Sequence, residues 1–188
     1  LSELEVTVAP TNDLKYWKEL HASKWESSSI PKPWKVNAGS KVNEGNQSVI
    51  LTKSGKDTHI QLSEFFHVGP FTGVGFDQKA GPELDTQLLR EKTYEHGGNS
   101  LQWVSKPEWK DGELYGSVFS GENSANYLAK EIKVTNDMEL PISLGSDDGI
   151  KVFLNGKTVL AKNIGRGAAP DQDQVVLKLK KGKNNLLL

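Results

Sequence analysis

The sequence predicts an all-β fold: a β-sandwich, jelly-roll-like, with an irregular N-terminal extension. Apolar residues alternate with polar ones in several short segments, as at Leu140, Ile142 and Leu144. Turn-forming residues separate these segments roughly every eight to twelve positions, and few stretches show helical periodicity. Period-two runs with such regular turns are typical of sandwiches and jelly rolls.

The N-terminal third predicts little regular structure. Alternation over residues 4–8 favours a short strand, and a polar cap favours one or two helical turns over 12–20. Residues 21–47 are rich in Ser, Pro and Gly and are expected to be irregular. Two apolar runs, 49–51 and 59–62, flank a Ser-Gly-Lys-Asp turn and predict a hairpin.

These patterns predict that the chain is divided into two parts. Residues 1–60 are expected to form N-terminal strands and an irregular extension packed on the body, and residues 61–188 the β-sandwich domain. Both ends resemble interruptions within a longer chain, so we expect a domain of a larger protein.

The middle of the chain alternates between strands and Gly-rich turns. Residues 65–71 predict a buried strand that ends near a proline, and a Gly-rich loop follows over 73–82. A short helix is predicted within 84–99, ended by a Gly-Gly-Asn sequence. Further strands are expected at 101–104 and 114–119.

The last third has the clearest pattern. Two alternating apolar runs flank the Asp147-Asp148-Gly149 turn, which predicts antiparallel sheet with acidic groups displayed at one edge. Asn155 and Gly156 follow, and both tolerate the positive φ that a type I′ hairpin turn requires.

Composition limits the classes of function. The 188 residues carry 23 basic and 24 acidic side chains, so no overall field attracts nucleic acid or an anionic membrane. The absence of Cys excludes disulfides, thiol nucleophiles and cysteine-ligated metal sites within this chain. No apolar run reaches membrane-spanning length, and no catalytic or nucleotide-binding fingerprint is present. We expect neither a nucleic-acid partner nor membrane insertion.

Three motifs together resemble a known type of module. They are the Phe66–Phe71 strand with the Gly75-Phe76-Asp77 sequence after it, the Gly121-Glu-Asn turn that leads to Tyr127, and the stretch from Gly145 to Asp171. They resemble the non-catalytic, carbohydrate-binding-like β-sandwich module of large exported planctomycete-type bacterial proteins that also carry c-type haem domains. The resemblance implies export, to the periplasm or cell surface, and neighbouring domains in the same longer chain.

The Asp-Asp-Gly sequence, its apolar strand and the Asn-Gly also resemble protective-antigen-type lectin domains. In that family adjacent aspartates can hold a Ca²⁺ ion that grips sugar hydroxyls, and Asp147 and Asp148 match the pair. Ca²⁺ takes six to eight oxygen ligands, so it would need further donors from converging loops. The alternative is a turn in which the aspartates hydrogen-bond their own backbone.

Chain direction predicts which loops meet. A strand of about seven residues at roughly 3.3 Å each separates the Asp147-Asp148 turn from the Asn155-Gly156 turn by about 20 Å. The next strand returns, so the 163–174 loop is expected beside the two aspartates. The predicted ligand site therefore consists of Asp147, Asp148, Arg166, Asp171 and Asp173, with Arg166 donating to hydroxyls or a uronate.

Surface aromatics are the other candidates, because sugar rings stack their C–H faces on aromatic rings. Trp109 lies between a proline and a Lys-Asp-Gly turn, so it is predicted to be exposed and ligand-binding. Trp103 is expected in the core, and Phe153 is expected to leave the face of its neighbours and pack against another element. His67, in an apolar strand, is expected to be a hydrogen-bonded buried imidazole.

The sequence favours a non-catalytic accessory module that binds a polysaccharide or oligosaccharide within a larger exported protein. The alternative is a structural or docking domain that holds neighbouring domains and has no glycan ligand. A minor alternative is a glycan-active enzyme on a jelly-roll scaffold, with a carboxylate pair drawn from residues such as Glu83, Glu108 and Glu122.

Overall fold

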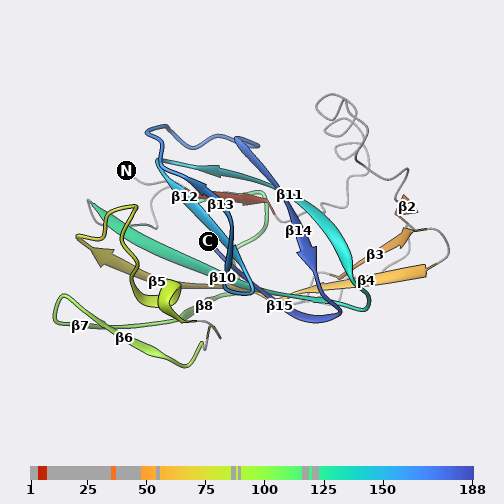
Figure 1. The fold of residues 1–188 in the computed structure, drawn as a ribbon, viewed down its shortest axis with the longest axis horizontal. Helices are drawn as coiled ribbons and strands as arrows, with labels where there is room; N and C mark the ends of the chain where they lie inside the picture. The colour runs from red at the N-terminus through yellow and green to blue at the C-terminus, as the bar shows by residue number, and fades with distance from the viewer. Residues whose placement is uncertain are drawn as a thin grey trace.

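The computed structural model describes residues 4–7, 35–36, 48–53, 56–85, 88, 90–115, 119 and 123–188 (Figure 1). The predicted helix over 12–20 lies outside these residues, and so does nearly all of the predicted irregular segment. The first strands are β1 (Leu4–Thr7), β2 (Lys35–Val36), β3 (Ser48–Lys53), β4 (Lys56–Leu62) and β5 (Phe65–Thr72). A 3-10 helix, η1 (Gly81–Leu84), precedes β6 (Thr93–His96), β7 (Asn99–Gln102), β8 (Val104–Lys106) and β9 (Leu114–Tyr115). The chain continues with β10 (Ser124–Val134), β11 (Met138–Ser146), β12 (Ile150–Leu154), β13 (Lys157–Lys162), β14 (Asp173–Leu179) and β15 (Gly182–Leu187).

The all-β prediction is confirmed, and every strand pairing of the described residues is antiparallel. The described residues form three sheets, the smallest of which is the hairpin β6–β7. Of the other two, which we call the smaller and the larger sheet, the smaller has the order β14-β11-β1-β9. The larger sheet has the order β13-β12-β15-β10-β4-β3-β2, with β5 paired to both β10 and β8. The β-sandwich and its jelly-roll strand order remain predictions.

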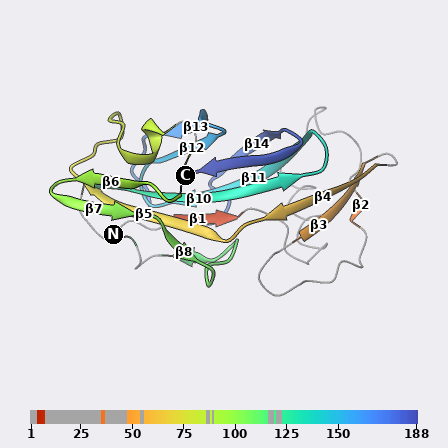
Figure 2. The ribbon, with the colours of Figure 1, turned by 90° about the horizontal axis from the view of Figure 1, so that it is seen from below.

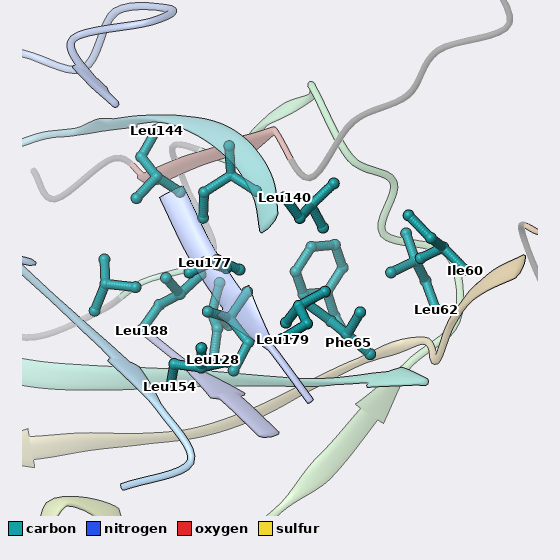
Figure 3. Close-up of a cluster of buried hydrophobic side chains, with 14 of the residues drawn as sticks. Ile60, Leu62, Phe65, Leu128, Leu140, Leu144, Leu154, Leu177, Leu179 and Leu188 are labelled. Atoms are coloured by element: carbon teal, nitrogen blue, oxygen red, sulfur yellow. The ribbon is translucent and has the colours of Figure 1, made fainter. Parts of the chain in front are cut away.

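The main core lies between the two sheets. Leu140 and Leu144 of β11 and Leu177 of β14 enter it from the smaller sheet, and Leu128 and Leu154 enter it from the larger one (Figure 3). Each residue follows the period-two alternation of its strand, so one face of each sheet is apolar. One apolar core therefore joins the two sheets.

Several strands of the larger sheet are buried on their other face as well. There Phe153 of β12, Tyr127 of β10 and Phe71 of β5 pack with Tyr94 and Trp103 in a second apolar cluster. The chain between β5 and β8 supplies this cover, and its hairpin β6–β7 lies alongside β5 (Figure 2). The predictions that Trp103 is buried and that Phe153 packs against another element are confirmed.

The helix predicted within 84–99 is wrong. The structure has η1 at its start and the hairpin β6–β7 at its end, in which Tyr94 faces Leu101. Gly97 and Gly98 have φ values of 56° and 79°, which suit a tight hairpin turn. The glycine pair thus connects two strands rather than ending a helix.

The last third corrects one expectation and confirms another. β11 and β12 flank the Asp-Asp-Gly turn but belong to different sheets, so residues 147–149 form an arch between the sheets rather than a hairpin. Asn155 and Gly156 do form the predicted hairpin turn between β12 and β13, with φ values of 51° and 76°. No described helix is both long and apolar enough to cross a membrane.

Candidate functional site

The arch of residues 147–149 lies beside the 163–172 loop, as chain direction predicted. The Asp148 amide donates to the Arg166 carbonyl at 2.8 Å, and the Arg166 amide donates to Asp148 Oδ1 at 3.2 Å. These bonds join a turn between the sheets to a loop that returns from β13. We call this end of the molecule, with residues 147–149 and 163–172, the arch end.

Asp173 is the buried charge at the arch end. Its side chain is 0% exposed and forms ion pairs with Arg166 and Lys162. Burial pushes the pKa of Asp173 upward, but hydrogen bonds from the two cations outweigh burial and hold the pKa below its usual value. Asp173 is therefore an ionised anchor beneath the loop.

Arg166 connects Asp173 to Ser146, the residue just before the arch. Its Nη2 also donates to Ser146 Oγ at 2.8 Å, and its Nε donates to the Ser146 carbonyl at 3.2 Å. Only 15% of the side chain is exposed. The sequence predicted that this guanidinium serves a ligand, whereas three of its contacts are within the protein, so its geometry is that of a positioning residue.

The rest of the loop is fixed by a glutamine. Gln172 accepts from the Ser146 amide at 3.0 Å and donates to the Gly167 carbonyl at 2.7 Å. A loop of ten residues without regular structure is thereby tied to the end of β11 at several points. Such fixed loops are the usual place for binding groups on a β scaffold.

The other predicted acidic residues are placed differently. Asp148 is exposed, and Asp147 and Asp171 are half-buried. Asp148 and Asp171 have φ values of 59° and 58°, a left-handed conformation that Asp tolerates in turns. Among the described residues, no group of three or more His, Cys, Asp or Glu is arranged to hold a metal ion.

Phe76 joins the arch end and was missed by the sequence analysis. A Cβ added at Gly149 would lie 2.8 Å from Phe76 Cδ2, so the ring lies directly against the glycine of the arch. The ring is half-buried. The signal was the Gly75-Phe76-Asp77 sequence in a Gly-rich loop, but nothing in the sequence indicated which distant turn the ring contacts.

Lys151 holds the Phe76 loop on the larger sheet. Its Nζ lies 5.0 Å from the Phe76 ring centroid and 3.0 Å from Glu83 Oε2. Glu83 also accepts from the Tyr127 hydroxyl at 2.8 Å. Burial, and then the bond to Glu83, raise the pKa of Tyr127. This buried network fixes both ends of the 76–83 segment.

Trp109 does not belong to the arch end, and the prediction that it is exposed is wrong. It is 8% exposed and stacks on Tyr115 with ring centroids 4.9 Å apart. Phe119 and His67 contact other sides of the ring. The flanking turn is exposed, but the indole is enclosed by His67 of the distant β5 and by Tyr115 and Phe119, which follow it in the chain.

His67 is half-buried and hydrogen-bonded, close to expectation. Its Nε2 lies 3.0 Å from Asn126 Oδ1, and burial lowers its pKa. A small pocket of about 40 Å³ lies elsewhere, at the Asn155-Gly156 end. It is lined by Pro82, Glu83, Asp85, Leu88, Phe153, Gly156, Asn185 and Leu187.

No known family, curated protein or solved structure matches this chain.

Proposed function

We propose that this chain is a non-catalytic accessory module that binds carbohydrate at the arch end. The observation that carries the proposal is the Phe76 ring, which is half-exposed and lies against Gly149, the residue that follows the exposed Asp148 in the arch. Carbohydrate recognition uses this combination, since an aromatic face stacks on sugar C–H groups while carboxylates and amides accept hydroxyl protons.

The fixed loop supports the proposal. Binding is tighter when the groups that contact a ligand are ordered beforehand, because less conformational entropy is lost. The ion pairs of Asp173 and the bonds of Gln172 order the 163–172 loop without help from regular structure. Residues 163–165 are exposed on that loop and are free to contact a ligand.

The state of the buried acids supports a non-catalytic role. A glycosidase acid needs a carboxyl that keeps its proton, which requires a raised pKa. In the described part of the chain the buried carboxylates instead form ion pairs with Lys or Arg side chains, and the pKa of one of them, Asp173, is lowered by its two cations. These pairs are Glu83 with Lys151, Asp85 with Lys92, Asp111 with Lys130, and Asp173 with Arg166 and Lys162.

A glycan array followed by calorimetry tests the proposal. The wild type is expected to bind at least one glycan, and Phe76→Ala is expected to weaken that binding by about three- to tenfold, the usual range for an aromatic contact. Asn155→Ala is the matched control, because Asn155 lies at the far end of β12. Equal loss in both variants, or no binding by the wild type, would contradict the proposal and favour the docking alternative.

We also propose where this module occurs. The sequence resemblance is the basis for placing the module in a larger exported protein, beside neighbouring domains, in the periplasm or at the cell surface. The five exposed large apolar side chains of the described residues lie on separate segments of the chain.

A further inference from the structure

We propose that the arch end selects neutral glycans and discriminates against acidic ones, such as those that contain uronates. This inference rests on the proposed function and concerns the charge of its ligand. It follows from which charged groups at the arch end are already bound within the protein and which are exposed.

The two cations at the end of β13 and in the loop after it already form ion pairs within the protein. Arg166 and Lys162 both pair with the fully buried Asp173. Arg166 is largely buried, and Lys162 is 46% exposed but directed to the same carboxylate. A uronate that recruited either cation would have to draw it from a buried anion, and leaving a buried charge without its partner is costly.

The cation on β12 also forms an ion pair within the protein. Lys151 pairs with Glu83, whose side chain is 5% exposed, and it also lies 3.5 Å from the Gln78 carbonyl. Its Nζ lies over the Phe76 ring, so it holds the ring and the loop together. Lys151 is therefore committed to the protein rather than to a ligand.

The charges left for a ligand are mainly negative. Asp77, next to Phe76, and Asp148 are exposed, Asp147 is half-buried, and none of the three forms an ion pair with a described residue. Lys79 is exposed on the same loop and offsets part of this charge. A ligand carboxylate would approach within the range over which like charges repel, roughly 8 Å at physiological salt.

The test uses one glycan in two forms: a uronate-containing oligosaccharide and its carboxyl-reduced, neutral counterpart. Calorimetry on the wild type at low salt is expected to give at least about fivefold tighter binding of the neutral form, and a smaller ratio at high salt. Asp77→Asn is expected to tighten binding of the acidic form about two- to fivefold and to leave the neutral form unchanged. Lys79→Gln, of opposite sign, is expected to weaken binding of the acidic form.

Equal or tighter binding of the acidic form would overturn the inference while leaving the proposed function in place. An Asp77→Asn variant whose ratio equals that of the wild type would also overturn it. If neither form binds and the array finds no other glycan, the proposed function fails and the inference fails with it.

Discussion

Asp173 is the residue on which the geometry of the arch end depends. It is buried, and it joins Lys162 at the end of β13 to Arg166 in the loop, while Arg166 reaches Ser146 before the arch. One carboxylate thereby connects three segments. Removing one partner of a buried ion pair costs more than the pair contributes, since the remaining charge is left without compensation.

Asp173→Asn is expected to lower the free energy of unfolding by about 2–3 kcal/mol at neutral pH, somewhat less than for a fully buried pair because Lys162 is partly exposed. Its pKa is lower in the folded protein than when unfolded, so its stabilisation is present above about pH 4 and is lost as pH falls through the folded value. Urea titrations should therefore show the difference between wild type and variant shrinking from pH 5 to pH 2. A difference that stays constant over this range would contradict the assignment.

Gly149 and Phe76 are expected to be energetically coupled. A Cβ at Gly149 would lie 2.8 Å from the Phe76 ring and 3.1 Å from the Lys162 carbonyl. Gly149→Ala should thus destabilise the fold by about 1–3 kcal/mol through overpacking. In the Phe76→Ala background the same change should cost less, because the ring is gone. Additive costs in a double-mutant cycle would show that the two residues are not in contact.

At the scale of elements, β12 separates two kinds of turn. The arch before β12 crosses between the sheets and carries acidic groups. The Asn155-Gly156 turn after β12 is a hairpin turn that is hydrogen-bonded to β15. Asn155 Nδ2 donates to Asn184 Oδ1 at 3.0 Å, and Asn155 Oδ1 accepts from the Asn185 amide at 2.8 Å. The second turn is thus structural, and any ligand at the arch end lies away from it.

Asn155→Ala should separate stability from binding. It removes two hydrogen bonds and places Ala at a φ of 51°, so it should cost about 1–3 kcal/mol of stability. Glycan affinity at a temperature where the variant is folded should equal that of the wild type. A loss of affinity that matches the loss caused by Phe76→Ala would place the ligand near the hairpin instead.

The accuracy of the sequence predictions follows from how local each signal is. The Asn155-Gly156 turn and the return of the 163–172 loop depend on neighbouring residues and chain direction, and both are found. Trp109 was misplaced because one partner, His67, is distant in sequence, and the turn beside Trp109 gave no sign that Tyr115 and Phe119 fold back onto the ring. The helix within 84–99 was misjudged because a Gly-Gly pair ends helices and also turns hairpins.

At the scale of the whole molecule, the strands β5, β10, β12 and β15 of the larger sheet are covered on both faces. The smaller sheet packs on one face, and the segment between β5 and β8 packs on the other. Trp109, which the sequence offered for ligand stacking, and Phe153 are both used in these clusters. Among the described residues, the faces of these four strands are therefore filled by the protein itself, which favours loops and edges as the places for a ligand.

The melting temperature in the presence and absence of Ca²⁺ tests whether the arch binds an ion that stabilises the folded protein. Asp148 already accepts from the Arg166 amide, and the turn conformation of Asp148 is one that Asp adopts without a metal. We therefore expect the same melting temperature with millimolar Ca²⁺ and with a chelator, as measured by calorimetry. An ion bound only by the folded state would raise the melting temperature, and loss of that increase in Asp148→Asn would establish the calcium alternative.

NMR titration of the isotopically labelled protein with the best array glycan tests the central claim most directly. Amide shifts are expected to concentrate at residues 75–78, 147–149 and 163–167, with little change at Asn155 and Gly156. Shifts centred on the Asn155-Gly156 turn, or no glycan that binds at all, would contradict a carbohydrate site at the arch end.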